Sequence, residues 1–349
     1  MTEADVYQDI SAKAQQPHSR WIPRILKKLI TPDEGRMILE LPLSVREFAA
    51  RYGMDQTEAE RKLEGFANKG LALPLTKQGE RKYYCVSTPI QVHDATIHSA
   101  LNKKYDPVPM EIVEMWKNWR ETEWLETLKL MEHAPHHMRG RAIPSWSTVK
   151  DHPDLHPLED LRAILKAAPA IAVNDCPCRW LQFQRGECDK NPYACISLTT
   201  GSVNYIVERG IGERITLEQG YELLQRCEEW GLIPTAGGSG QPRQLCMCWA
   251  PECIILRAQT LYGYDLWDRS RFDAEVDPDA CQGCETCADR CQFQAISMVD
   301  ERAVVDSIRC FGCGVCAAAC PSGALTMKLK RPIEHVTEGG MGPKYDPFA

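Results

Sequence analysis

The sequence predicts an α+β protein of several domains, and three observations lead to that expectation. At 349 residues the chain exceeds the roughly 100 to 200 residues of one domain. Amphipathic helical runs fill its first third, and shorter apolar runs of strand length follow. Near the end, two copies of C-x2-C-x2-C-x3-C stand 29 positions apart. We expect an N-terminal domain over residues 1–100, a cysteine-rich mixed α/β middle domain over 101–270, a domain over 271–332 built around the two copies, and an extended tail over 333–349.

Composition narrows the class of protein further. The opening residues, MTEADVYQDISAKAQQ, lack the basic-then-apolar pattern of a secretion signal, and no run reaches the roughly 20 apolar residues of a membrane helix. The 17 cysteines therefore imply metal in a reducing, cytoplasmic compartment rather than a disulfide framework. The net charge of −7 argues against broad affinity for nucleic acid, and no membrane span is expected.

The N-terminal domain follows a helix, turn, helix, hairpin order. RWIPRILKKLI has an amphipathic period, Ser44 can cap VREFAARYG, and Asp55 or Thr57 can cap TEAERKLEGFANKG. Two strands, LALPL and KYYCVST, then flank a turn at 77–80. Over about residues 20–90 this pattern resembles the winged-helix family. The lone Cys85 in the second strand is expected to be a core residue.

The winged-helix resemblance raises DNA binding as a function. The helix that would read DNA, residues 55–69, carries four acidic residues against three basic ones. Phosphate contacts depend on Arg and Lys, so this helix is poorly suited to them. We expect the domain to act as a scaffold or a protein-docking module.

The helix over residues 111–131 and the turn after it supply two further groups of candidates. Trp116, Trp119 and Trp124 are expected to pack in a core rather than to stack on a cofactor. A loose histidine cluster follows in a turn-rich stretch, for which solvated side chains are the default interpretation; its members are His133, His136 and His137.

The middle domain contains a first cysteine motif directly after the strand AIAVND. It has the form C-x-C-x9-C-x6-C, with Cys176, Cys178, Cys188 and Cys195. Four thiols within twenty residues can converge on one metal centre. Arg179 and Arg185 would offset the negative charge that thiolates bring.

A second motif, C-x-C-x4-C, contains Cys246, Cys248 and Cys253 and follows a run, TAGGSGQP, that we expect to be a loop. The resulting seven thiols do not divide by four. Either the first motif holds one cluster and this trio a second, with a noncysteine ligand or Cys227, or one site mixes both motifs and the surplus thiols are structural. Zinc, unmetallated thiols and an open catalytic iron remain alternatives. Cys227 lies on the apolar face of its helix, which favours core packing.

The C-terminal copies contain four cysteines each, and the second is followed by Pro321. Thiolates at this spacing fit a [4Fe-4S] cubane, whose first three ligands come from one run while the fourth cysteine reaches the other cluster. On that rule one cluster is held by Cys281, Cys284, Cys287 and Cys320, and the other by Cys310, Cys313, Cys316 and Cys291.

The repeat extends beyond the cysteines: Ala274, Val276 and Asp277 recur as Ala303, Val305 and Asp306, and Ala295 and Ile296 recur as Ala324 and Leu325. Over about residues 272–330 the chain resembles the bacterial-type two-cluster ferredoxins. The resemblance implies a pseudo-twofold pair of short β-hairpins with a helical turn after each cysteine run. Gln292 departs from that family, which usually has a proline at this position.

Residues 140–265 resemble an uncharacterised family of anaerobic iron–sulfur proteins that pair a C-x-C-R motif with a later cysteine-rich stretch. That resemblance implies further cubanes, one or two in the middle domain. We expect an electron-transfer subunit, more than a catalyst alone, that passes single electrons through several [4Fe-4S] clusters to or from a partner oxidoreductase in an anaerobic pathway. The alternative is a redox-sensing transcriptional regulator that uses the winged helix. Homo- or hetero-oligomeric assembly stays open.

Overall fold

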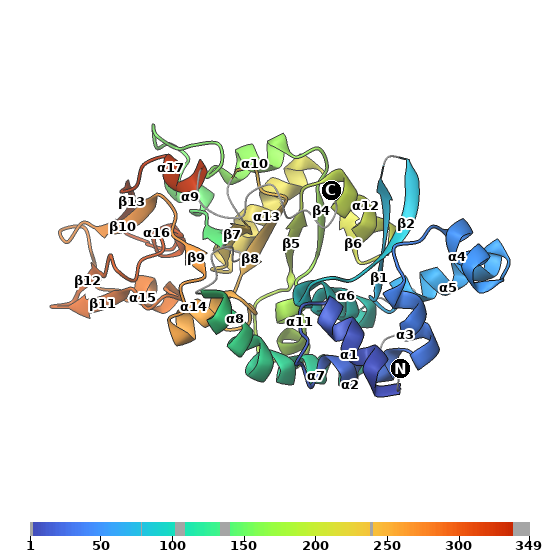
Figure 1. Ribbon diagram of the computed structural model, residues 1–349. Helices are drawn as coiled ribbons and strands as arrows, with labels where there is room; N and C mark the ends of the chain where they lie inside the picture. Colours follow the sequence, from blue (N-terminus) through green and yellow to red (C-terminus); the bar gives the residue numbers. More distant parts are fainter. Residues whose placement is uncertain (1–2, 78, 102–108, 133–139, 238–239, 338–349) are drawn as a thin grey trace. The chain divides into compact units, whose positions relative to one another are not determined.

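The computed structural model describes residues 3–77, 79–101, 109–132, 140–237 and 240–337, and it is an α+β protein (Figure 1). The histidines at 133, 136 and 137 lie outside these ranges. The described chain divides into two compact units: the first contains residues up to 127 together with 204–212, and the second contains the rest. Three elements cross the limits between units, namely α8 (Leu125–Glu132), α12 (Thr200–Glu208) and β6 (Gly212–Arg214).

The first unit is mainly helical. Its elements are α1 (Glu3–Lys13), α2 (Ile22–Leu29), α3 (Pro32–Leu39), α4 (Val45–Tyr52), α5 (Gln56–Asn68), β1 (Ala72–Lys77), β2 (Glu80–Cys85), α6 (Pro89–Leu101), α7 (Met110–Trp119) and the π-helical η1 (Arg120–Trp124). Ser44 caps α4 and Asp55 caps α5, each accepting a backbone N–H three residues later. Gly53 ends α4 with φ 65°, a conformation that glycine adopts without strain.

β1 and β2 form an antiparallel hairpin, and Leu43 adds a bridge to Tyr83 of β2. The order of α2, α4, α5 and the hairpin is the order on which the winged-helix interpretation rests, and α3 and this bridge were not anticipated. That interpretation stays a prediction. Cys85 is buried, as expected for a core residue.

The three tryptophans predicted to be core residues are buried: Trp116 and Trp124 are 1% exposed and Trp119 is fully buried. The π-helical turn explains how two of them meet. Because hydrogen bonds in a π-helix span five residues, side chains five positions apart align. Trp119 and Trp124 accordingly stack, with ring centroids 5.0 Å apart and planes 22° from parallel.

Glu47 provides a test of pH-dependent stability in this unit. Its carboxylate accepts the Ser44 backbone N–H in a capping box and pairs with Lys82 Nζ at 3.0 Å. These contacts, the Ser44 N–H foremost, lower the pKa of Glu47 from 4.5 to about 2. A lowered carboxyl pKa stabilises the fold above the unfolded value, and the contribution disappears as pH falls from 4.5 to about 2. Thermal melting midpoints of Glu47→Gln should fall less steeply over that window than those of the parent chain; parallel curves would contradict this.

The second unit is built on a seven-stranded sheet of order β6-β4-β5-β8-β7-β3-β9 (Figure 1). Among the strand pairs with a described register, β3 and β9 are parallel and the others are antiparallel. Besides β6, its strands are β3 (Gly140–Ala142), β4 (Ala172–Asp175), β5 (Tyr193–Ser197), β7 (Ile233–Gly237), β8 (Gln244–Cys248) and β9 (Trp267–Asp268). The helices around them are α9 (Trp146–Val149), α10 (Leu161–Ala167), α11 (Pro177–Gln184), α13 (Leu217–Glu229) and α14 (Leu256–Tyr262). The expected glycine-rich loop begins later than predicted, because Thr235 to Gly237 complete β7.

Alternation along the strands gives this sheet two different faces. One face packs against α10 and α13 and forms the core, with Val173, Ile196, Leu245 and Met247 from the strands. Cys227 lies in the same core and is 1% exposed, as predicted. The residues between these positions, which include Cys195, Cys246 and Cys248, point to the other face because successive side chains of a strand alternate.

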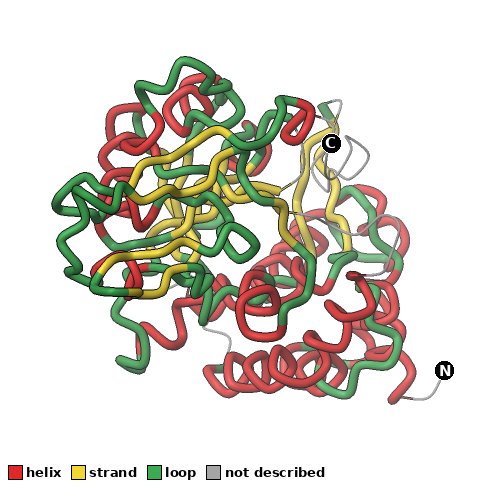
Figure 2. The backbone as a smooth tube through the Cα atoms, turned by 90° about the vertical axis from the view of Figure 1, so that its left-hand side faces the viewer, coloured by secondary structure: helices red, strands yellow, loops and turns green. Residues whose placement is uncertain are grey.

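The C-terminal part of this unit contains short strands and single-turn helices joined by loops (Figure 2). They are β10 (Phe272–Val276), α15 (Thr286–Arg290), β11 (Ile296–Val299), β12 (Arg302–Val305), α16 (Val315–Ala318), β13 (Leu325–Leu329) and α17 (Glu334–Thr337). The expected pair of hairpins is half right. β11 and β12 form a hairpin, but β10 pairs with β13, so the second sheet joins the first strand of the repeat to the last.

Residues predicted to belong to an extended tail begin with the helical turn α17, in which Val336 is 1% exposed. Within the described ranges, we find no helix that combines the length and apolar character required to cross a membrane.

Several contacts connect the C-terminal part to the segments that join the strands and helices of the seven-stranded sheet. Arg271 forms an ion pair with Glu159 at 3.1 Å, and their side chains are 6% and 1% exposed. Gln292 accepts the Ala250 N–H at 2.6 Å and donates to the Gly231 carbonyl at 2.8 Å. The Gln292 side chain thus fills the position of the family's proline with two hydrogen bonds.

Candidate metal centres

Both cysteine runs of the C-terminal repeat are introduced by the same aspartate turn. The Asp277 carbonyl accepts the Cys281 N–H at 3.1 Å, and its carboxylate accepts the Asp279 N–H at 2.9 Å. Asp306 repeats both bonds, to Cys310 at 2.9 Å and to Ile308 at 2.8 Å. Such turns present the first thiol of each run in the same direction.

A glycine lies two positions after the first cysteine of each run. Gly283 and Gly312 have φ 67° and 66°, and a Cβ on either would lie within 2.5 Å of a backbone oxygen, that of Glu301 or Phe272. Each loop therefore runs directly over backbone, the turn between β11 and β12 at Gly283 and the strand β10 at Gly312, which only glycine permits.

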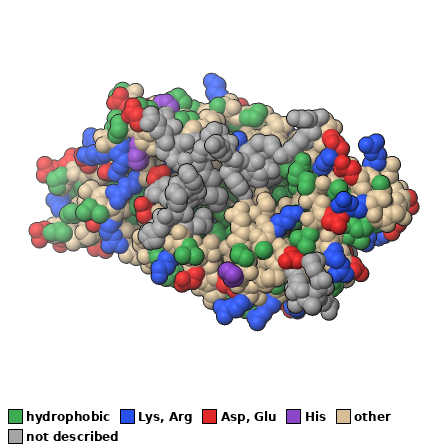
Figure 3. Space-filling model, viewed as in Figure 1, with side chains coloured by type: hydrophobic (Ala, Val, Ile, Leu, Met, Phe, Trp, Pro, Cys, Tyr) green, Lys and Arg blue, Asp and Glu red, His purple; other side chains and the backbone are tan. Residues whose placement is uncertain are grey.

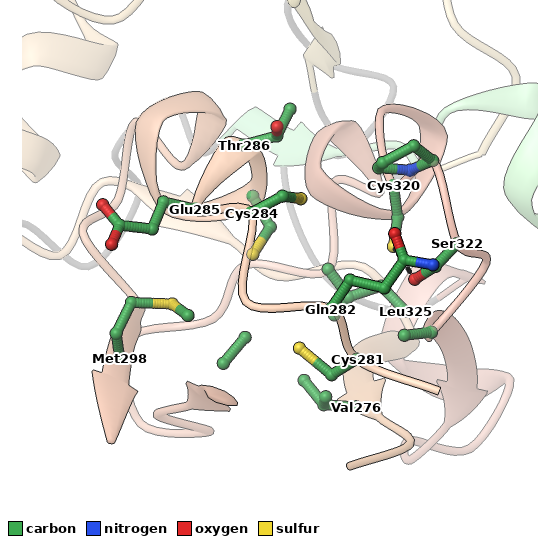
Figure 4. Close-up of a pocket in the computed structure, with 14 residues that line it drawn as sticks. Val276, Cys281, Gln282, Cys284, Glu285, Thr286, Met298, Cys320, Ser322 and Leu325 are labelled. Atoms are coloured by element: carbon green, nitrogen blue, oxygen red, sulfur yellow. Dashed lines mark hydrogen bonds between the residues drawn. The ribbon is translucent and has the colours of Figure 1, made fainter. Parts of the chain in front are cut away.

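The first group of four predicted ligands lines one hollow of about 330 Å³, part of which is open to solvent. Cys281, Cys284 and Cys287 come from the first run and Cys320 from the second. Figure 4 shows Cys281, Cys284 and Cys320 directed toward one another across it. Cys284 is exposed, so this group reaches the surface of the unit.

The second group, Cys291, Cys310, Cys313 and Cys316, is also brought together, since Cys291 and Cys310 both raise the pKa of Cys313 and Cys316 electrostatically. Burial is the larger cause and raises the pKa of Cys313 to about 12. Beside this group, the rings of Phe293 and Phe311 stack at 4.3 Å.

Backbone N–H groups point at the thiols of both groups. The N–H groups of Ala303 and Gly283 lower the pKa of Cys281. Burial raises the pKa of Cys320, but hydrogen bonds from Ser322 and from the Leu325 N–H lower it overall. The Ala295 N–H donates to the sulfur of Cys291 at 3.3 Å. Donors of this kind stabilise thiolates and the sulfurs of a bound cluster.

The middle-domain thiols lie on the sheet face opposite α10 and α13. Cys195 of β5 is directly opposite Cys246 of β8 in the antiparallel register, and Cys248 follows two positions later on the same face. Gln244 Nε2 donates to the sulfur of Cys195 at 2.8 Å, and Thr235 Oγ1 lies 3.3 Å from that of Cys248.

Two other segments add thiols to this face. Cys176 and Cys178 lie at the start of α11, and Cys253 lies in the turn before α14. The Cys178 thiol hydrogen-bonds those of Cys176 and Cys253. Interactions with the thiols of Cys178 and Cys248, together with the Leu256 N–H, hold the pKa of Cys253 well below 9.0. Interactions with the thiols of Cys195 and Cys248 raise the pKa of Cys246.

Not every predicted candidate belongs to this cluster. The groups that act on Cys188 are, after burial, the Lys190 N–H, Glu252 and Arg179, not another thiol. Arg185 pairs with Glu187 at 3.7 Å, whereas Arg179 is 1% exposed and its charge lowers the pKa of Cys176. Six of the seven candidates thus interact with one another, whereas the strongest interactions of Cys188 are with Lys190, Glu252 and Arg179.

The sequence analysis missed Thr235 and Gln244, whose side chains contact the thiols of Cys248 and Cys195. Polar residues of this kind carry no motif, and only the register of β5, β7 and β8 brings them to the site. Gln292 was noticed as a departure from a family pattern, but its two hydrogen bonds could not be anticipated.

Across the described parts of the chain, no three His, Cys, Asp or Glu side chains are arranged to hold a single metal ion. This holds for the eight cysteines of the C-terminal repeat as well. A single ion requires ligands that converge on one point, whereas each thiolate of a cubane binds its own iron.

Comparison with known proteins gives two findings, of which the family match lies in the C-terminal part. Residues 280–324 match the 4Fe-4S dicluster domain family. A segment of 70 residues, 20% of the chain, is 58% identical to one of the subunits of the ferredoxin:CoB-CoM heterodisulfide reductase of Methanosarcina mazei. The match spans only 9% of that much longer protein. The C-terminal part thus contains a 4Fe-4S dicluster domain, and a segment of the chain is similar to an iron–sulfur reductase subunit.

Proposed function

We propose that this chain is an electron-transfer subunit that passes single electrons through several [4Fe-4S] clusters to or from a partner oxidoreductase in an anaerobic pathway. The observation that carries the proposal is the gathering of eight thiols into two groups of four, each group taking its fourth member from the other run. A [4Fe-4S] cluster supplies one-electron chemistry when it is bound.

The residues of the chain have separate tasks in this proposal. Cys281, Cys284, Cys287 and Cys320 hold one cluster, and Cys291, Cys310, Cys313 and Cys316 hold the other. Backbone N–H groups donate to the sulfurs, and the stacked rings of Phe293 and Phe311 exclude water from the second group. Because Cys284 is exposed, the first group is the one that a partner protein can approach.

The proposed partner and the proposed anaerobic pathway rest on sequence similarities rather than on the geometry of the thiols. The relative in Methanosarcina mazei is a subunit of a reductase, which favours an oxidoreductase complex for this chain too. An anaerobic pathway follows from the resemblance of residues 140–265. The cysteines of the described chain are free thiols, which supports a reducing compartment such as the cytoplasm.

The surface gives the DNA-binding alternative no additional support. In Figure 3, Lys and Arg side chains are interspersed with Asp and Glu over the visible described surface rather than gathered into one patch. On α5, Glu64 accepts hydrogen bonds from Tyr83 and Arg209 of the same unit. Phosphate recognition depends on clustered basic residues.

Cys320→Ser tests the proposal. The variant should lose the cluster of Cys281, Cys284 and Cys287, about four irons, and keep the other cluster. Cys313→Ser, from the same run, should do the reverse. EPR spectra of the reduced proteins and iron content check both; loss of the same signal in both variants would refute the ligand sets. Parent protein that holds its iron but accepts no electrons from dithionite would refute the proposed function.

A further inference from the structure

We infer that the thiols of Cys176, Cys178, Cys195, Cys246, Cys248 and Cys253 surround one iron–sulfur cluster, separate from the two of the dicluster domain and drawing its ligands from both middle-domain motifs. This inference deepens the proposed function and rests on it for the identity of the metal. It also removes Cys188 from the site, although Cys188 belongs to the first motif.

The first step is the sheet register. Antiparallel pairing sets Cys195 opposite Cys246, and the period of two brings Cys248 to the same face. Thr235 lies opposite Cys246 on the other side, and its hydroxyl reaches the sulfur of Cys248. The backbone hydrogen bonds between β5 and β8 thus fix the positions of these three cysteines, and none of the three lies in a loop.

The second step is the series of thiol contacts that crosses the two motifs. The Cys176 N–H donates to the Pro192 carbonyl at 2.7 Å, and Arg179 donates to the carbonyl of Met247, which lies between Cys246 and Cys248, so the first motif lies beside β5 and β8. Interactions with the thiols of Cys176 and Cys253 raise the pKa of Cys178. Cys253 contacts Cys248, Cys248 contacts Cys246, and Cys246 contacts Cys195. The six thiols therefore neighbour one another across both motifs, and this arrangement favours one shared site over a separate site for each motif.

The third step is a buried cation with unused hydrogen-bonding capacity. Arg179 is 1% exposed and donates to the carbonyls of Met247 at 3.0 Å and Asn191 at 2.8 Å. Its Nε has no partner within the described chain. A buried guanidinium without a carboxylate is costly unless an anion lies beside it. An iron–sulfur cluster with four thiolates is such an anion, adjacent to Cys176.

The fourth step concerns the class of ligand. Thiolates select soft or borderline metals, and a single tetrahedral ion uses four of them. Six contiguous thiols exceed that number, and no three of them are arranged around a single ion. A cluster spreads its ligands over several irons, so four of the six bind, at least one of them from Cys176 and Cys178 and at least one from Cys246 and Cys248, and the other two border the cluster.

The experiment compares two double variants with their combination, all purified without oxygen. The parent chain should contain about twelve irons, three cubanes of four. Cys176→Ser with Cys178→Ser should remove about four, and Cys246→Ser with Cys248→Ser should remove the same four. The fourfold variant should lose no more than either double variant, because all four residues act on one cluster. A loss of about eight in the fourfold variant would mean two sites and would overturn the inference.

Cys188→Ser is the matched control, since it lies in the same motif and should keep all the iron. Loss of one cluster in this variant would overturn the inference. Cys253→Ser, a single change in a turn, serves if a double variant fails to fold. The EPR signals of the dicluster domain separate the two proposals. If the parent chain contains about eight irons and shows these signals, the middle-domain cluster is refuted while the proposed function stands. Absence of the signals refutes the proposed function.

Discussion

Replacing Arg271 with Met is expected to lower the free energy of unfolding of the second unit by about 3 to 5 kcal/mol, the usual cost of removing one partner of a buried ion pair. Glu159, 1% exposed, would keep its charge without the 3.1 Å partner. Arg271 also donates to the carbonyls of Asp154 and Arg331. Urea denaturation under anaerobic conditions measures the loss.

Two observations identify the cause of that loss. Burial already raises the pKa of Glu159. A raised carboxyl pKa destabilises the fold as pH increases through it, so the loss in Arg271→Met should shrink toward pH 4.5, the ordinary value. Glu159→Gln combined with Arg271→Met should recover part of the stability at neutral pH. Equal losses in the single and double variants would show that packing, not charge, is responsible.

Replacing Trp119 with Ala is expected to destabilise the first unit by about 3 to 5 kcal/mol, the range for a large aromatic side chain removed from a core. Trp119 is fully buried and touches Trp116 edge-on at 5.1 Å and Trp124 face-on at 5.0 Å. The cavity would therefore open at the centre of an aromatic cluster. Thermal or urea denaturation followed by tryptophan fluorescence reports the change.

Phenylalanine at the same position is the matched control. The indole N–H of Trp119 has no partner within the described chain, so Trp119→Phe removes no hydrogen bond and should cost much less than alanine. Trp116 differs, because its N–H donates to Thr96 Oγ1 at 2.7 Å. Trp116→Phe should therefore be more destabilising than Trp119→Phe. The reverse order would contradict this account of the cluster.

The dicluster domain was largely predictable because its information is local and repeated. Each cysteine run lies within eleven residues, and the same aspartate turn precedes both. The exchange of the fourth cysteine between groups followed from the spacing alone. The pairing of β10 with β13 did not, since it joins strands at opposite ends of the repeat and no local pattern encodes such a contact.

The middle domain shows the opposite case. Its two motifs were visible in the sequence, but the grouping of their thiols depends on register between β5 and β8, strands separated by α12 and α13. In the sequence Cys188 has the same standing as the other cysteines of its motif, because the spacing of residues along the chain does not show which groups a side chain contacts. In the structure the strongest interactions of this thiol are with Lys190, Glu252 and Arg179.

The two hydrogen bonds of Gln292 have a consequence for modularity. In this chain the residue after Cys291 forms hydrogen bonds with backbone groups outside the dicluster domain. It accepts the Ala250 N–H and donates to the Gly231 carbonyl. Excising the C-terminal part would leave those groups, together with buried Glu159, without their partners. The segment and the sheet belong to one compact unit, so a segment exchanged into this position has to supply the same three contacts.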